Sequence, residues 1–218
     1  MSGEEPARSM APPSGRELLH RLRTLLPGRP LGVAEIDGDR PVLRRASVLV
    51  PIYEEEGEPT LLLVQRSADL GKHPGQLAFP GGGRDPGEDD LTCALREMRE
   101  EIGISPNAVE VLGRLDPRPT YTGFLVSPFV GFLPEWPLPL LPEPGEVAGV
   151  LHVPMRRLLD PALLATHELQ PGRRVDFFHV DDEVIWGATA RIVRELLELA
   201  LGRRLEAAGS VPWEKVRW

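Results

Sequence analysis

Residues 82–104 read GGRDPGEDDLTCALREMREEIGI, and this stretch holds the clearest helix of the sequence. Its apolar residues recur at helical spacing and form one stripe: Leu91, Ala94, Leu95, Met98 and Ile102. Asp89 and Asp90 stand at its N-terminal end, where the helix dipole favours negative charge. Gly103 suits the position that follows the last turn. The pattern predicts an amphipathic helix over residues 89–102.

The polar side of this helix carries three glutamates at spacing i, i+3 and i+4, namely Glu97, Glu100 and Glu101. Carboxylates at this spacing project from one side and repel one another by a few tenths of a kcal/mol per pair. Clustered oxygen ligands are what Mg²⁺ or Mn²⁺ prefers. The alternative is a solvated acidic face that Arg96 and Arg99 neutralise. The preceding Phe79-Pro80-Gly81-Gly82-Gly83 favours a site, because glycines let backbone approach a ligand closely.

Gly82, Glu88 and the run REMREEIGI at 96–104 have the spacing G-x5-E-x7-REUxEExGU, where U is aliphatic. This segment resembles the complete Nudix box, and every fixed position of the box is filled. The resemblance implies a loop-helix-loop catalytic unit in an αβα sandwich around a mixed β-sheet. It also implies hydrolysis of a nucleoside diphosphate linked to another moiety, with Mg²⁺ or Mn²⁺.

The resemblance also implies roles for individual residues. Glu97, Glu100 and Glu101 would be metal ligands, Arg96 would orient a neighbouring glutamate, and Glu88 would be structural. Glu100 is one candidate for the general base. Glu146 is another, because it follows a proline-rich loop and precedes a predicted strand. The alternative for Glu146 is a solvated side chain at a loop–strand junction.

Upstream of the box, residues 62–67 (LLVQRS), Gly75 and residues 79–82 (FPGG) resemble the signature of the coenzyme A pyrophosphatase subgroup. The implied reaction converts coenzyme A to 3′,5′-ADP and 4′-phosphopantetheine or its acyl form. Two positions depart from the signature: Val64 replaces a threonine, and Gly71 replaces an arginine, with Lys72 beside it. The candidate substrate-binding residues are Arg66, Ser67, Lys72, Gln76, Phe79, Gly81 and Gly82, and His73 is a further candidate contact.

Other functions share parts of this pattern. The same chemistry on ADP-ribose, NADH or another nucleoside diphosphate derivative is the main alternative. A non-catalytic, nucleotide-sensing Nudix-like module is another, but such modules usually lack box glutamates and none is missing here. Cys93 lies on the apolar stripe and is expected to be a core thiol rather than a nucleophile.

Composition excludes several classes of protein. The 218 residues carry a formal net charge of −8, which disfavours nucleic-acid binding. No run approaches ~18 consecutive apolar residues, so no membrane span is expected. The single cysteine excludes an intramolecular disulfide. Residues 1–14 contain no apolar segment typical of a secretory signal. We therefore expect a cytoplasmic protein, either a monomer or a homodimer.

The rest of the chain predicts an α+β fold. We expect a flexible leader over 1–13, an N-terminal helix and loop over 14–43, a Nudix hydrolase domain over 44–205 and a tail over 206–218. Ser14 is a predicted N-cap for the first helix, and a closing helix is expected at 188–201. Residues 67–84 are expected to be turns. Strands are predicted at 46–53, 60–65, 108–115, 127–133, 147–153, 175–180 and 184–186.

Overall fold

The apolar runs in the first two thirds of the chain form the main sheet. The computed structural model describes residues 13–32, 43–68, 75–120, 122–170 and 173–210. Within them, β1 runs parallel to β7 and antiparallel to β2, so the sheet is mixed, as predicted. The strands of this sheet are β1 (Arg44–Glu55), β2 (Glu58–Arg66), β3 (Leu77–Ala78), β4 (Gly81–Gly83), β5 (Glu110–Arg114), β6 (Arg118–Pro119), β7 (Phe124–Leu133) and β8 (Val147–Pro154).

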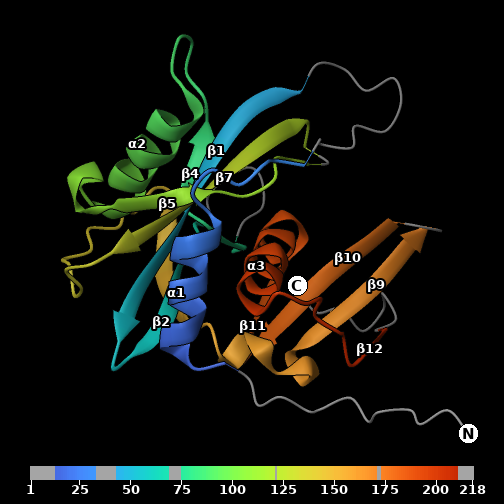
Figure 1. The fold of residues 1–218 in the computed structure, drawn as a ribbon. Helices are drawn as coiled ribbons and strands as arrows, with labels where there is room; N and C mark the ends of the chain where they lie inside the picture. Colours follow the sequence, from blue (N-terminus) through green and yellow to red (C-terminus); the bar gives the residue numbers. More distant parts are fainter. Residues whose placement is uncertain (1–12, 33–42, 69–74, 121, 171–172, 211–218) are drawn as a thin grey trace, which may run out of the picture.

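Helices cover both faces of this sheet, and Figure 1 shows α2 on one side and α1 and α3 on the other. Their bounds are Gly15–Leu25 for α1, Asp90–Ile102 for α2 and Gly187–Leu201 for α3. Alternate side chains of β1 serve the two faces, since successive residues of a strand point in opposite directions. Val50 packs with α1 and α3, whereas Leu49 packs with α2. The predicted αβα sandwich is confirmed.

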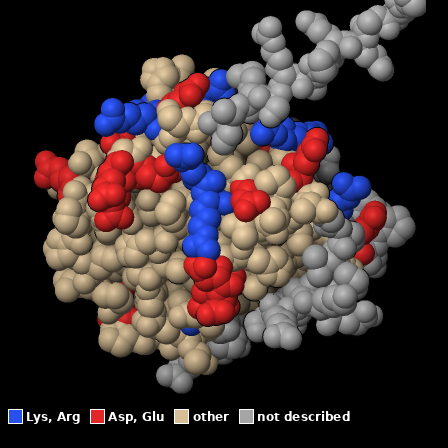
Figure 2. Space-filling model, turned by 90° about the horizontal axis from the view of Figure 1, so that it is seen from below, with Lys and Arg blue, Asp and Glu red and all other residues tan. Residues whose placement is uncertain are grey.

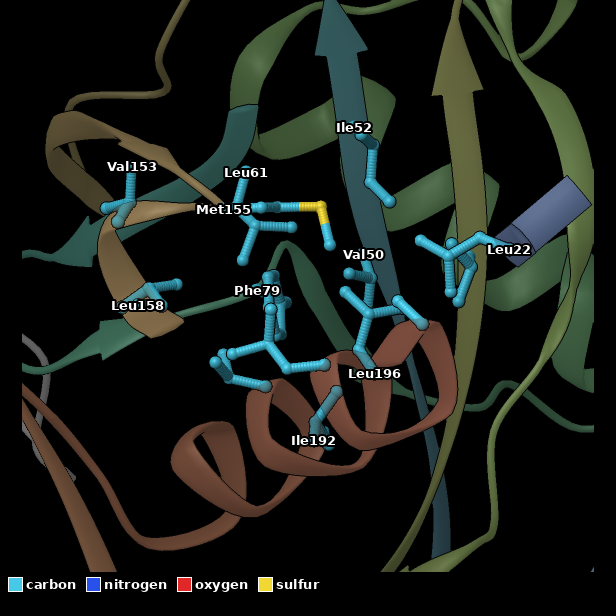
Figure 3. Close-up of a cluster of buried hydrophobic side chains, with 14 of the residues drawn as sticks. Leu22, Val50, Ile52, Leu61, Phe79, Val153, Met155, Leu158, Ile192 and Leu196 are labelled. Carbon is cyan, nitrogen blue, oxygen red and sulfur yellow. The ribbon is translucent and has the colours of Figure 1, made fainter. Parts of the chain in front are cut away.

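The core on the α1 and α3 side is apolar throughout its centre. Leu22 of α1 and Val50 of β1 are completely buried, as is Leu196 of α3. Figure 3 shows these side chains converging between the sheet and α3. Burying a side chain of this size contributes about 1.5–3 kcal/mol, so this layer is a major source of stability.

A second sheet lies beside the first and was not predicted as a separate unit. Its strand order is β11-β10-β9-β12. The strands predicted at 175–180 and 184–186 are present as the antiparallel pair β10 and β11, whereas β9 and β12 were not predicted. Phe178 and Ile185 of this sheet are fully buried in the core that α3 shares. The bounds are β9 (Leu164–Gln170), β10 (Arg173–Val180), β11 (Glu183–Trp186) and β12 (Gly209–Ser210).

Most predicted elements are present with shifted ends. Ser14 is the N-cap of α1, as predicted, and its side chain accepts a hydrogen bond from the amide of Glu17. The segment 67–84, predicted as turns, contains the short strands β3 and β4. Glycine has low strand propensity, but β4 forms because β1 offers it backbone partners at residues 46–48. The predicted leader falls outside the described residues except for Pro13.

Charged side chains are mixed on the surface. On the face that Figure 2 shows, Lys and Arg side chains lie among Asp and Glu side chains, and no continuous basic area is visible. Among the described residues, no helix is both long enough and apolar enough to cross a membrane.

Candidate active site

Two glycines allow the loop before α2 to pack against its neighbours. A Cβ atom on Gly82 would lie 2.5 Å from Cδ of Glu97, and one on Gly81 would lie 2.4 Å from the carbonyl oxygen of Ser47. Real Cβ atoms do not approach other atoms so closely, so a side chain at Gly81 would collide with the backbone of β1, and one at Gly82 would displace the Glu97 carboxylate. The residue type in the loop therefore sets how near the Glu97 carboxylate comes to the backbone of β4.

Both ends of α2 are capped, and the sequence predicted the cap at Gly103. The side chain of Asp89 accepts hydrogen bonds from the amides of Leu91 and Thr92, each at 3.0 Å. Gly103 adopts a left-handed conformation (φ 77°), and its amide donates to the carbonyl of Arg99 at 3.0 Å. These caps satisfy helix-end groups that would otherwise lack partners. They fix both ends of the helix that carries Glu97, Glu100 and Glu101.

Arg96 is the hub that orders the acidic side chains. Its Nε donates to Oε1 of Glu88 at 2.9 Å, and its Nη2 donates to Oε2 of the same carboxylate at 3.1 Å. Its Nη1 donates to Glu97 at 2.8 Å and to Glu100 at 2.9 Å. This ion pair holds the pKa of Glu88 below its usual range. Arg96 therefore fixes Glu97 and Glu100, while Glu88 fixes Arg96 in turn.

Glu101 is the most buried carboxylate of the cluster, with 3% exposure. Its Oε2 accepts a hydrogen bond from the amide of Gly81 at 3.0 Å. Burial raises its pKa to about 8, and the negative charges of Glu97 and Glu146 add to this effect, while the Gly81 amide and Arg66 oppose it. The cluster therefore concentrates negative charge in a poorly solvated place.

Glu97 shares this environment. Its pKa is raised by burial, and the charges of Glu100 and Glu146 add to the shift, whereas Arg96 opposes it. The same neighbour, Glu146, acts on both Glu97 and Glu101. The structure thus brings the carboxylate that the sequence singled out beyond the box close to the glutamates of α2.

The donor set suits a divalent cation. Three carboxylates lie on one side of α2, and their oxygens are the ligands that Mg²⁺ and Mn²⁺ prefer. Burial is the main cause that raises the pKa of Glu97 and Glu101, and repulsion from neighbouring carboxylates adds to it; a bound cation relieves both. In the described residues no three His, Cys, Asp or Glu side chains are arranged as a ready-made cage. Glu97 and Glu100 are instead hydrogen-bonded to Arg96.

The C-terminal end of β2 faces this cluster. Arg66 continues the register of Leu62 and Val64, whose side chains pack on the α2 side, and its charge acts on Glu101. The amide of Arg66 donates to the carbonyl of Gln76 at 3.0 Å. The amide of Ser67 donates to the carbonyl of Glu146 at 2.8 Å. Arg66 and Glu146 are thus joined to the site from different strands.

One other predicted position lies away from this cluster, and two are outside the described residues. The side chain of Phe79 is 3% exposed and packs in the α1 and α3 core, so the structure gives it a packing role instead of a substrate contact. Lys72 and His73 lie outside the described residues. The expected core thiol is confirmed, because Cys93 is fully buried and burial raises its pKa to about 11.

Asp90 has a role that the sequence did not reveal. Its carboxylate accepts a hydrogen bond from the hydroxyl of Ser127 on β7 at 3.0 Å. It also pairs with Arg84 of the preceding loop at 2.9 Å. It therefore ties the start of α2 to the sheet. The sequence suggested only a favourable dipole interaction, since nothing local identifies a partner 37 residues away.

Comparison with known proteins identifies the family of this chain. The model of the NUDIX domain family matches residues 43–174. The chain belongs to the Nudix family. This Nudix protein is 43% identical to an "Uncharacterized Nudix hydrolase NudL" of Photorhabdus laumondii, over 71% of this chain and 84% of that protein. It is 42% identical to a NudL of Yersinia pestis, over 71% of this chain and 79% of the relative.

A solved structure supports the same fold. A Nudix hydrolase from Nitrosomonas europaea aligns with a TM-score of 0.50 and 16% identity, covering 79% of this chain and 80% of that protein. This Nudix protein is therefore an α+β hydrolase with a mixed sheet flanked by helices, and its activity is that of a pyrophosphohydrolase. Nudix enzymes act on nucleoside diphosphate derivatives and typically use divalent metal ions.

Proposed function

We propose that this Nudix hydrolase cleaves the pyrophosphate bond of coenzyme A or its derivatives, giving 3′,5′-ADP and 4′-phosphopantetheine or its acyl form. One observation carries the proposal. The Arg66-Ser67 pair of the coenzyme A signature ends β2 beside Glu101 and Glu146. A cation at this place suits a substrate that carries a phosphate besides its pyrophosphate.

In this proposal, Glu97, Glu100 and Glu101 hold Mg²⁺ or Mn²⁺. Divalent ions, when bound, neutralise the oxygens of the pyrophosphate and make a water molecule more acidic. Arg96 keeps Glu97 and Glu100 oriented through its Nη1 atom. The absence of side chains on Gly81 and Gly82 lets this loop lie against β1 and against the Glu97 carboxylate.

A water molecule attacks one phosphorus of the pyrophosphate and a carboxylate takes its proton, while the bond from that phosphorus to the bridging oxygen breaks and the other phosphate leaves with that oxygen. Glu100 and Glu146 are the two candidates for this general base. The side chain of Glu100 is half exposed, and Glu146 is exposed at the start of β8. An effective base lies within reach of the attacking water, which the exposure of both side chains allows. Replacing each by glutamine separates the two roles, since only the loss of the base removes the fall of kcat at low pH that protonation of the base causes.

The substrate class is tested with purified protein and Mg²⁺ or Mn²⁺ against coenzyme A, its acyl and disulfide forms, ADP-ribose and NADH. We expect the highest kcat/KM for a coenzyme A species, with 3′,5′-ADP identified as a product by mass spectrometry. Preference for ADP-ribose or NADH would replace the proposed substrate by the alternative, and Gly71 in place of the usual arginine would then explain the loss of coenzyme A recognition.

Arg66→Ala tests recognition of the 3′-phosphate. We expect KM to rise about 10-fold or more for coenzyme A and by less than about 3-fold for 3′-dephospho-coenzyme A, as loss of a charge-assisted phosphate contact predicts. Arg114→Ala is the matched control, because Arg114 is an exposed arginine on β5. Equal changes for both substrates would remove Arg66 from recognition of this phosphate.

A further inference from the structure

The proline-rich segment 134–146 runs from the end of β7 to Glu146, and one aromatic pair fixes its beginning. The ring of Trp136 stacks on Tyr53, with centroids 4.0 Å apart and planes at 22°. Tyr53 is itself 1% exposed, and its hydroxyl lies 2.9 Å from Nδ1 of His152 on β8. Trp136 is therefore docked on a side chain that the sheet holds rigidly.

The middle of the segment is bonded to the end of α2. The amide of Leu141 donates to the carbonyl of Ile102, and the amide of Glu143 donates to the carbonyl of Glu101, each at 2.9 Å. The last carbonyls of a helix have no partners within it, so the segment supplies them. A Cβ atom on Gly103 would lie 2.8 Å from Cβ of Leu141, which shows how closely the two chains pass.

The end of the segment holds Glu146 by its backbone. The amides of Glu146 and Val147 donate to the carbonyl of Glu143 at 2.9 and 2.8 Å. The carbonyl of Glu146 accepts the amide of Ser67 at 2.8 Å. The backbone of Glu146 is thus held at two points. One is Glu143, which is itself bonded to Glu101, and the other is Ser67 at the end of β2.

The composition of the segment makes it stiff. Five of its thirteen residues are proline: Pro134, Pro137, Pro139, Pro142 and Pro144. Each proline fixes its own φ, so the segment has few soft torsions with which to absorb a displacement at one end. Leu138 and Leu140 also pack against the α2 side of the core. A change at Trp136 is therefore transmitted toward Glu146.

We propose that Trp136 is a positioning residue, whose stack on Tyr53 anchors the segment 134–146 so that it holds the carboxylate of Glu146 beside Glu97 and Glu101. This role deepens the proposed function, because it rests on Glu146 taking part in hydrolysis. It is independent of which nucleoside diphosphate derivative is the substrate.

A double-mutant cycle tests this role. We expect Trp136→Ala to lower kcat about 5-fold or more, with KM changed less than about 2-fold, when Glu146 is present. In the Glu146→Gln background the same change should lower kcat less than about 2-fold, because the group that Trp136 positions is already lost. Equal losses in both backgrounds, or an unchanged kcat in Glu146→Gln alone, would overturn the proposal.

Two variants control for general damage. Trp136→Phe retains an aromatic stack and should keep kcat within about 2-fold. Trp186→Ala removes a half-buried tryptophan from β11, and its effect should be the same in both backgrounds. Rates are divided by the folded fraction, which thermal unfolding of each variant provides.

Amide hydrogen exchange gives a readout that does not depend on activity. Trp136→Ala should speed exchange at the amides of Glu143 and Ser67, and Trp136→Phe should not. Unchanged exchange in Trp136→Ala would show that the stack does not anchor the segment, even if kcat falls. If the wild type cleaves ADP-ribose but not coenzyme A, the proposed substrate fails while the cycle still tests Trp136 on ADP-ribose.

Discussion

The two faces of the main sheet are built from the same strands, but they have different roles. On β2, Leu61 and Leu63 pack with α1 and α3, whereas Leu62 and Val64 pack with α2. Arg66 continues the second register and ends beside carboxylates. One side is closed by apolar side chains, and the other combines an apolar base with a charged rim. A strand of period two thus builds stability and a reactive site at once.

The difference is electrostatic. The buried core around Leu196 gains free energy from burial alone. On the α2 side, burial and like charges raise the pKa of Glu97 and Glu101, which means that the ionised forms are held at a cost. Side chains that weaken the metal-free protein and suit a divalent cation are typical of functional sites. Substitutions on the α2 side should therefore lower activity, whereas substitutions on the α1 and α3 side should lower stability.

Glu101→Gln breaks the α2 side and should have the largest effect. We expect kcat/KM for the preferred pyrophosphate substrate to fall at least about 100-fold, because a charged oxygen ligand is lost where charge develops. The glutamine side chain of this variant still offers an oxygen to the amide of Gly81, so the far-UV circular dichroism should be unchanged. Turnover like that of the wild type would contradict the assignment of Glu101 to the metal site.

The matched change on the other side is Leu196→Ala. Leu196 is fully buried on α3, and its truncation leaves a cavity. We expect the free energy of unfolding to fall by about 2–5 kcal/mol. Activity per folded molecule should stay within about 2-fold. A selective loss of activity without loss of stability would contradict the division of labour between the two sides.

The pH dependence of stability sharpens the comparison. The pKa of Glu101 is raised to about 8 in the folded protein, above the value of 4.5 for an ordinary glutamate. The folded state therefore binds this proton more tightly, so the contribution of Glu101 to stability is complete below pH 4.5 and is lost as the pH rises toward 8. Between pH 5 and 8 the metal-free wild type should lose about 3 kcal/mol more than Glu101→Gln. Urea unfolding with a chelator measures this difference, and parallel curves would contradict it.

The sequence predicted the local elements better than the assembly. Ser14 and Gly103 were predicted as caps from local signals and are confirmed, whereas Asp89 was expected only to interact with the helix dipole and is the N-cap. Strand β4 was missed, because three glycines become a strand only when β1 offers hydrogen-bond partners. Strand β9 was missed because the sequence LATHELQ has no clear period of two. Both depend on partners that are distant in sequence, which no local pattern contains.

The site was predictable to a similar degree. The spacing of Glu97, Glu100 and Glu101 on one side of α2 follows from helix geometry alone. The anchoring role of Asp90 depends on Ser127, which lies on another strand. Phe79 stood in the glycine-rich signature and was expected at the substrate, but its side chain packs in the core on the opposite side of the sheet. Sequence thus identifies the chemical groups, whereas the fold decides which of them meet.

The N-caps of α2 and α1 should show the smallest difference between the two sides of the sheet. Asp89 caps α2 with two amide hydrogen bonds at 3.0 Å and accepts the hydroxyl of Thr92 at 2.6 Å, whereas Ser14 caps α1 with one bond of 3.3 Å. We expect Asp89→Ala to lower Tm by about 2–4 °C and Ser14→Ala by about 1 °C or less. These bonds hold the pKa of Asp89 below its usual range, so its contribution should vanish as the carboxylate is protonated at low pH, unlike that of Ser14. Equal shifts of Tm at neutral pH, measured by calorimetry, would show that α2 is held by its packing and not by its cap.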